Sequence, residues 1–291
     1  FFFTSLQEMD IIEEAKKEAE RHKELGKNMQ RAVEEGNLDL LKQMYSEDKL
    51  MFLLGTNESN QPWLHLAARY GHIDILEWMV EQEFADYLQL KKKDNDERTV
   101  LFAAIDDEPR LDVLMWIHDK NSSLLKKRDD EETNLLHFAA SKGYLDIMKW
   151  IHSQNTSLLN QCDRDGTNTL MFAVKSSSLD CIQWVYEQDN SLLKKVDEDG
   201  ENVLIRAGPK LTIELLTWFY EQDNSILNQT NNDGKSIMTS AASAGNLELM
   251  KFIHEKDSSL ISKTQSDGTT ILHSATFNSR LEAIKWILEI D

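Results

Sequence analysis

Proline and glycine are scarce in this chain, which has 3 prolines and 11 glycines among its 291 residues. With 41% hydrophobic and 29% charged residues, the composition excludes long disordered linkers and indicates a folded protein. No apolar run approaches the roughly 20 residues that a membrane-spanning helix needs. The opening Phe-Phe-Phe is too short for the core of a signal peptide. We therefore expect an ordered chain without membrane insertion.

Basic residues and cysteines are also few. The 32 Lys and Arg side chains stand against 51 Asp and Glu, and the resulting net charge of −19 disfavours nucleic acid or an anionic membrane as the ligand. A basic peptide or a basic protein face is the easier partner. The two cysteines, Cys162 and Cys181, make no CxxC motif or paired framework, which suits a reducing compartment. The expected location is intracellular, in the cytoplasm.

What the sequence does contain is a repeat, best seen in the stretch from Asn134 to Gly166. Similar stretches align on one alanine each, at Ala67, Ala104, Ala139, Ala173, Ala207, Ala241 and Ala275, which gives spacings of 37, 35 and then 34 residues. Each copy divides into two short amphipathic helices around a small or polar turn, followed by a polar segment related to Asp-x-Asp-Gly. Such a period predicts a stack of units that bury their apolar faces against their neighbours.

The segment before the clear copies predicts a cap for the stack. A capping box at Ser5-Leu6-Gln7-Glu8 and charged pairs at helical spacing indicate a leading helix over residues 1–26, with a break at Gly26. Residues 27–61 repeat the spacing of the template in weaker form and read as a degenerate first unit. Residues 62–291 hold seven repeats, of which the last is incomplete.

The repeats resemble ankyrin repeats. The characteristic start of that family is seen in Thr99-Val-Leu-Phe-Ala-Ala, Asn134-Leu-Leu-His-Phe-Ala and Thr270-Ile-Leu-His-Ser-Ala. Its turn glycine and following acid are matched by Gly71, Gly143 and Gly245 and by Asp74, Asp146 and Asp180. The tetratricopeptide alternative needs a tryptophan in the first helix, and here it lies in the second. The resemblance implies an all-α ankyrin-repeat solenoid of stacked helix-turn-helix units with projecting hairpin loops.

Some departures from the family pattern have structural consequences. Asparagine stands at the end of several second helices, where glycine is usual, and we expect a left-handed cap at Asn121, Asn155, Asn190 and Asn224. The apolar pairs that follow, such as Leu158 and Leu159, should close the stack beneath the hairpins. The recurring tryptophans of the second helices, such as Trp150 and Trp184, are read as a packing ladder between equivalent positions rather than an aromatic strip for ligands.

No constellation for catalysis or metal binding emerges. The chain has no phosphate-binding glycine loop, nucleophile elbow or calcium loop, and neither cysteine has an activating base. The histidines of the start motif, His65, His137 and His273, lie at equivalent positions of different repeats, and such positions are too far apart for one zinc ion even in neighbouring repeats, so we expect them to bond hairpin backbone. We therefore expect no catalytic residue, no metal and no cofactor.

The resemblance implies a non-catalytic scaffold for protein–protein interaction, whose concave surface of hairpin tips and first helices binds a protein or peptide partner. On this sequence that surface maps to Arg69, Tyr70, Asp96, Asp130, Lys142, Arg164, Asp165, Lys175, Asp199, Arg206, Lys210, Asn232 and Asp233. The acidic tips serve either as turn formers and solubilising groups or as one row that attracts Lys and Arg of a partner.

Two further alternatives stay open. Arg206 and Gly208-Pro209 interrupt a first helix, and this bend, together with Lys175 and Lys210, marks either an imperfect repeat or a part of the surface that a partner uses. The chain as a whole is either a free scaffold or the regulatory or targeting segment of a larger enzyme, channel or secreted effector. The second case, which the missing initiator Met and the incomplete last repeat favour, would allow docking within a longer chain.

Overall fold

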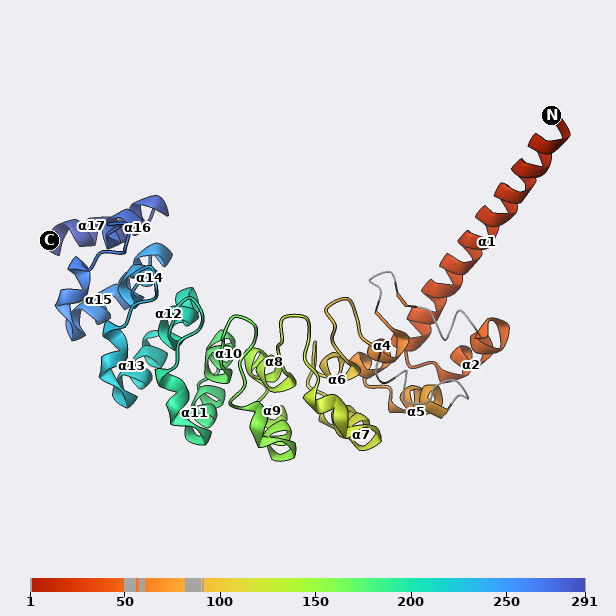
Figure 1. Cartoon of the computed structure of the whole chain (residues 1–291), viewed down its shortest axis with the longest axis horizontal. Coiled ribbons are helices and arrows are strands. Elements are labelled where there is room, and N and C mark those ends of the chain that lie inside the picture. The colour runs from red at the N-terminus through yellow and green to blue at the C-terminus, as the bar shows by residue number, and fades with distance from the viewer. Residues whose placement is uncertain (1, 50–55, 58–60, 82–89, 91, 291) are drawn as a thin grey trace. The chain divides into compact units, whose positions relative to one another are not determined.

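The computed structural model describes residues 2–49, 56–57, 61–81, 90 and 92–290, and it comprises two compact units, Phe1–Asp130 and Glu131–Asp291 (Figure 1). Within the described residues each unit consists of helix pairs, and the extended contacts are isolated bridges such as Cys162 with Asn168 and Thr230 with Ser236, which close hairpin loops. The predicted all-α helical repeat fold is confirmed.

Among its described residues, unit 1 contains a long first helix followed by shorter helices. Its elements are α1 (Phe2–Glu34), α2 (Leu38–Glu47), α4 (Trp63–Tyr70), α5 (Ile73–Glu81), α6 (Val100–Ala103), α7 (Leu111–Lys120) and the 3-10 helix η1 (Ser122–Lys126). The predicted break at Gly26 is wrong, because α1 runs through it to Glu34. A single glycine costs a helix only about 1 kcal/mol. Buried Met29 and Val33, on the last turns of α1, anchor the helix, which packs on α2 and α4.

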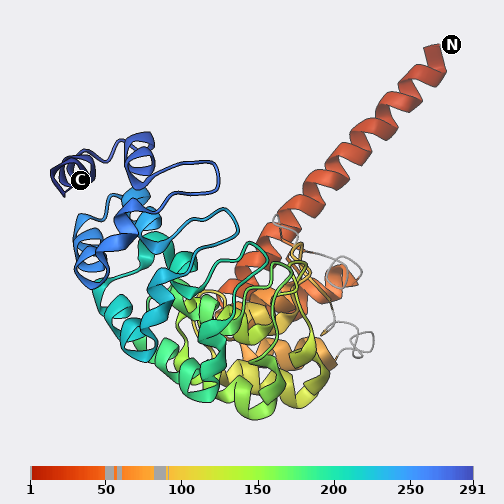
Figure 2. The ribbon, with the colours of Figure 1, turned by 60° about the vertical axis from the view of Figure 1, so that its left-hand side comes forward.

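Unit 2 repeats one helix pair along its length. Its elements are α8 (Leu135–Lys142), α9 (Leu145–Gln154), η2 (Thr156–Leu158), α10 (Thr169–Ser176), α11 (Leu179–Gln188), η3 (Asn190–Lys194), α12 (Val203–Ala207), η4 (Gly208–Lys210), α13 (Ile213–Gln222), η5 (Asn224–Asn228), α14 (Ile237–Ala244), α15 (Leu247–Lys256), η6 (Ser258–Ser262), α16 (Ile271–Phe277) and α17 (Leu281–Ile290). First helices pack on first helices and second on second, and the loops project side by side from the stack (Figure 2).

A buried polar residue starts the first helices α8, α10, α12 and α14 of unit 2. Asn134 and Ser236 form capping boxes with His137 and Thr239, which satisfies amide groups that the helix leaves free. The Asn134 side chain has a second task, because its Nδ2 donates to the carbonyl of Leu158, 3.1 Å away in the 3-10 turn. Asn168 and Asn202 form the same two bonds in the next two repeats. One side chain thus starts the first helix of a pair and also holds the 3-10 turn that follows the second helix.

The residue after each second helix differs from the expected cap. Asn121 and Asn155 have φ near −155° instead of a left-handed conformation, and the register places Asp189 and Asp223 there, so Asn190 and Asn224 lie inside 3-10 helices. The left-handed caps predicted at all four asparagines are therefore wrong. Each Asn or Asp instead accepts the backbone N–H two residues later and so starts a 3-10 turn.

The core lies between the helix pairs, with the tryptophans at its outer rim. The predicted closing pairs beneath the hairpins are buried, as with Leu158 and Leu159. The tryptophans of the second helices are only half-buried, and instead of facing their counterparts Trp184 packs edge-to-face on His152 at 5.4 Å and Trp218 on Tyr186 at 5.3 Å. The positions nearest the core are filled by aliphatic residues such as Ile151, which leaves the rings on the rim.

Candidate partner-binding surface

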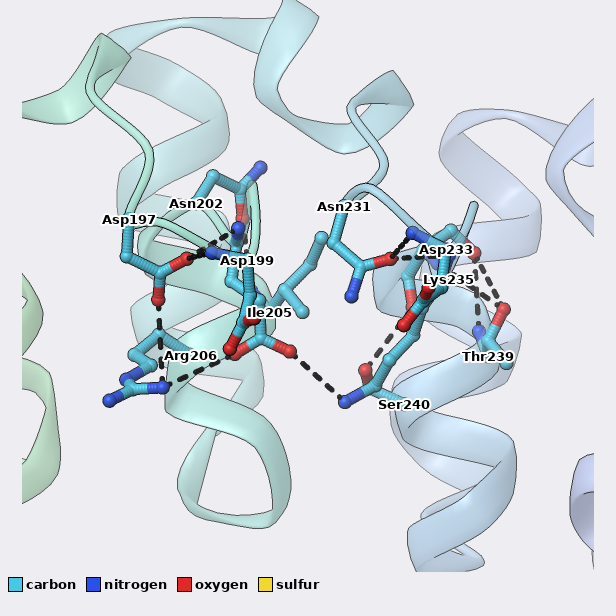
Figure 3. Close-up of polar contacts among 12 residues, drawn as sticks. Asp197, Asp199, Asn202, Ile205, Arg206, Asn231, Asp233, Lys235, Thr239 and Ser240 are labelled. Atoms are coloured by element: carbon cyan, nitrogen blue, oxygen red, sulfur yellow. Dashed lines mark hydrogen bonds and ion pairs between the residues drawn. The ribbon is translucent and has the colours of Figure 1, made fainter. Parts of the chain in front are cut away.

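The hairpins of unit 2 are shaped by one recurrent side-chain turn. In Asp163, Asp197 and Asn231 the Oδ1 atom accepts the backbone N–H groups two and four residues later, at 3.1 and 2.8 Å in each case. Figure 3 shows two of these turns, at Asp197 and Asn231. A glycine with positive φ, such as Gly200 at +74°, completes the loop. The first Asp or Asn of each of these three hairpins therefore shapes the loop.

The acid two residues after each of these turn residues lies on a ladder of backbone bonds between neighbouring tips. The donors and acceptors are Arg164 N to Glu131 O (2.9 Å), Glu198 N to Asp165 O (2.9 Å), Asn232 N to Asp199 O (2.9 Å) and Ser266 N to Asp233 O (2.7 Å). The side chains of Asp165, Asp199 and Asp233 are exposed, and within the described part of the chain no cation lies within ion-pair distance of them. The ladder thus holds three unused carboxylates at equivalent places.

Two acids of this row were missed in the sequence. Glu131 and Asp267 continue the 34-residue spacing of Asp165, Asp199 and Asp233, and both are exposed. Hydrogen bonds from Thr269 hold the pKa of Asp267 below its usual range. The spacing alone was a sufficient signal, but Glu131 lies in a hairpin without glycine, and Glu132 takes the positive φ of 59° there. Arg164, also predicted, reaches Glu131 at 3.5 Å.

Arg206 of α12 lies in an ion-pair network behind the tips. Its Nη1 is 3.5 Å from Asp197 Oδ2 and 3.7 Å from Glu201 Oε2, and Lys235 Nζ is 3.4 Å from the other oxygen of Glu201 (Figure 3). The Asp197 side chain is 1% exposed, and burial raises the pKa of its carboxyl. Arg206 is thus neutralised inside the fold. Asn232, another predicted site residue, is similarly engaged, since its Nδ2 donates to the carbonyl of Glu198 at 3.0 Å.

Three lysines complete the predicted set on the first-helix side. Lys142 Nζ lies 5.2 Å from the ring centre of Phe138, and Lys175 Nζ lies 4.2 Å from that of Phe172. Burial lowers the pKa of Lys175, and the nearby charge of Arg206 lowers it further. Lys210 Nζ donates to the Lys175 carbonyl at 2.6 Å. These are cation–π and helix-end contacts.

The Gly208-Pro209 bend that carries Lys210 is as expected from the sequence. The first helix α12 stops at Ala207, after five residues, and Gly208 has φ +52° and ψ −127°, a conformation that residues with a Cβ rarely adopt. The 3-10 turn η4 then carries Lys210 back towards the end of α10 in the preceding repeat. The shortened helix α12 thus allows Lys210 to contact the end of α10.

The four remaining predicted residues belong to unit 1. A groove of about 430 Å³ there is lined by Arg69, Tyr70 and Asp96, together with residues of α1 such as Glu34. Tyr70 is 39% exposed and stacks on His72. Asp96 pairs with Arg98 at 3.1 Å, and its carbonyl accepts the backbone N–H of Asp130 at 3.1 Å. The structure therefore brings three of the four together in one polar groove, while Asp130 stands at the next tip.

Comparison with known families agrees with this architecture. The family model for ankyrin repeats matches residues 29–125, 110–197, 136–225 and 205–291. The chain therefore belongs to the ankyrin repeat family, and it is a protein-interaction scaffold in that general sense. No curated protein matches it.

Solved structures show the same fold. One chain of the Bd0816 predatory endopeptidase from Bdellovibrio bacteriovorus in complex with immunity protein Bd3460 is 22% identical and aligns with a TM-score of 0.56. The alignment covers 69% of the present chain and 100% of that chain. At this identity the likeness concerns the fold alone.

Two kinds of feature are absent from the described residues. No helix among them combines the length and the apolar character needed to cross a membrane. In the same residues no three His, Cys, Asp or Glu side chains gather as a metal site would require.

Proposed function

We propose that unit 2 binds a protein or peptide partner on the face formed by its hairpin tips and first helices, and that the partner presents basic groups to the tips. The observation that supports this is the row of Asp165, Asp199 and Asp233, whose places are fixed by backbone bonds and whose carboxylates are not used within the described fold. Carboxylates held in place lose little entropy on binding, and their combined field attracts cationic side chains.

The other predicted contacts fit this proposal in different ways. Lys142 and Lys175 lie on the first-helix side of the same face, over the rings of Phe138 and Phe172. Arg206 and Asn232 hold the surface in shape through their own bonds. For the location of the protein we propose an intracellular compartment, on the basis of the two cysteines that the sequence does not pair.

The test is affinity capture from the source cells with the wild-type chain and with Asp165, Asp199 and Asp233 all changed to Asn. We expect the variant to lose most of the basic partners and to show a flatter dependence of binding on salt concentration, because charge attraction is screened by salt. The matched control changes Glu187, Glu221 and Glu255 to Gln. These three exposed acids have the same 34-residue spacing but lie on second helices, so the same charge is removed elsewhere.

The control variant should capture the same proteins as the wild type. If both triple variants weaken capture equally, net charge governs binding and the tips have no special role. If neither weakens it, the acidic row is not the binding surface.

A further inference from the structure

Two pairs of cations occupy the same place in the two units. Arg69 follows the aligned Ala67 by two residues, as Lys175 follows Ala173. In unit 1, Arg110 Nε donates to the Arg69 carbonyl at 2.8 Å, and in unit 2, Lys210 Nζ donates to the Lys175 carbonyl at 2.6 Å. In both units a basic side chain from the next repeat thus reaches the last turn of a first helix and stands beside a second cation.

In unit 1 the chain itself neutralises this pair. The segment before Arg110 carries three acids, and two of them, Asp106 and Asp107, form ion pairs with Arg69, the latter at 3.5 Å. The third, Glu108, is 2.9 Å from Arg110 Nη2. Carboxylates therefore fit against this kind of cation pair, and the fold offers a place for them.

In unit 2 the segment before the second cation supplies no such carboxylates. The segment before Lys210 is Gly208-Pro209, which contains no acid. Among the described residues, no carboxylate lies within ion-pair distance of Lys175 or Lys210, and the two acids of the nearby network are taken by Arg206. Lys175 is half-buried over Phe172, where Arg206 and Lys210 repel its charge. Asp163 and Asp165 attract it, but neither carboxylate forms an ion pair with its ammonium group.

We infer that Lys175 and Lys210 form a carboxylate-binding site that takes an Asp or Glu side chain of the partner. This rests on the proposed function and makes it more specific. The site lies on the first-helix side of the face, so a fitting partner is basic where it meets the tips and acidic where it meets α10 and η4. A carboxylate here would make charge-assisted hydrogen bonds to an ammonium group that has already lost part of its water, which strengthens the attraction.

The first experiment selects peptides from a random phage-displayed library on the full chain. Three forms are compared: wild type, Lys175→Gln, and Lys251→Gln as a control, since Lys251 is an exposed lysine of the second helix α15. We expect wild-type binders to be enriched in Lys or Arg and also in Asp or Glu. Lys175→Gln should lose the acidic enrichment and keep the basic one, which at the same time shows that this variant is folded. Lys251→Gln should keep both.

The outcomes separate the two claims. Basic enrichment without acidic enrichment overturns the carboxylate site and leaves the proposed function standing. Acidic enrichment that persists in Lys175→Gln overturns the site as well. Absence of basic enrichment overturns the proposed function, and absence of any binder contradicts both.

The second experiment measures the contact directly with a peptide from the wild-type selection and a version in which its Asp or Glu is changed to the amide. Wild type should bind the amide version about tenfold more weakly, as expected for loss of a hydrogen bond to a charged group. For Lys175→Gln the two peptides should differ by less than about twofold, because the partner of the carboxylate is already gone. An equal loss of affinity in both proteins would overturn the inference.

Discussion

The cation pairs of the two units show how one position in a repeat acquires two uses. In unit 1 the loop between α6 and α7 supplies Asp106 to Arg69, while in unit 2 the corresponding bend supplies none to Lys175. Both pairs are held by the same helix-end bond. What separates an internal ion pair from an open binding site is therefore the composition of a loop of a few residues, with no change in the stack.

The turns that follow the first helices at these pairs also differ between the two units. Gly71 of unit 1 has φ +84°, and a Cβ built on it would lie 2.6 Å from Nη1 of Arg110. Its counterpart in unit 2 is Ser177, which accepts the left-handed φ of 59° with a side chain in place. In unit 1 the absence of a side chain at Gly71 leaves room for the guanidinium group of Arg110. In unit 2 the turn holds Ser177 in a strained left-handed conformation.

The largest predicted difference between the units is in their response to acid. His65 of unit 1 is buried with one ring nitrogen bonded to the Arg98 carbonyl at 3.1 Å and the other without a partner, whereas His137 of unit 2 bonds through both. Burial lowers the pKa of His65 to about 4. The unfolded chain binds this proton near pH 6.5. The stability that the folded protein gains from a neutral His65 is therefore fully present above pH 6.5 and is lost as the pH falls towards 4.

We expect unit 1 to lose about 3 kcal/mol in this way between pH 6.5 and 4. Hydrogen exchange measured segment by segment would show the loss in α4 and α6. The variant His65→Gln, which can still donate to the Arg98 carbonyl, should flatten this pH dependence. An unchanged slope in the variant would contradict the assignment to His65.

The next largest effect is expected for Gly71→Ala. A left-handed conformation is unfavourable for alanine, and the added methyl group also meets Arg110, so we predict a loss of about 2 kcal/mol in a denaturant titration. Gly268→Ala is the matched control, since Gly268 has φ +82° with open space around its Cβ. It should lose only the conformational part, about 1 kcal/mol. Equal losses at both sites would show that Arg110 does not constrain the turn.

A smaller effect tests the internal neutralisation of the cation pair. Asp106→Asn should destabilise unit 1 by about 1 kcal/mol, because Arg69 and Asp106 are each about a quarter exposed and their ion pair is partly shielded from water. Glu108→Gln should change stability by less than about 0.5 kcal/mol, since Glu108 is 72% exposed. Thermal unfolding of the two variants decides this, and a larger effect at Glu108 would contradict it.

The smallest predicted effect is a gain. Ser177→Gly should stabilise unit 2 by about 0.5 kcal/mol, because relief of the left-handed strain exceeds the greater flexibility of glycine in the unfolded chain. A urea titration of the variant against wild type measures it. A loss of stability would mean that Ser177 is held by contacts that outweigh its strain.

Much of the fold was predictable because it depends on helix caps and turn residues that recur at the same positions of each repeat. Asn134 starts a helix, Gly143 ends one, and the spacing of such residues gives the register. The failures arose where tertiary contacts decide. Packing of α1 through Met29 overrides Gly26, and the side chain of Asn121 prefers to start a 3-10 turn.

The candidate surface was less predictable for the same reason. The positions of Asp165 and Asp199 follow from the repeat, but which charges are satisfied inside the fold depends on contacts between repeats. Arg206 and Lys175 look alike in the sequence, yet one is paired with Asp197 and Glu201 and the other lies over Phe172.

The most direct measurement of the central claim is the footprint of a selected peptide on the full chain by hydrogen exchange. We predict slower exchange at the tips, residues 163–166, 197–200 and 231–234, and in the first helices α10 and α12. Exchange in the second helices α9, α11, α13 and α15 should stay unchanged. Protection confined to those second helices would contradict the account, because it would place the partner on the opposite side of each helix pair.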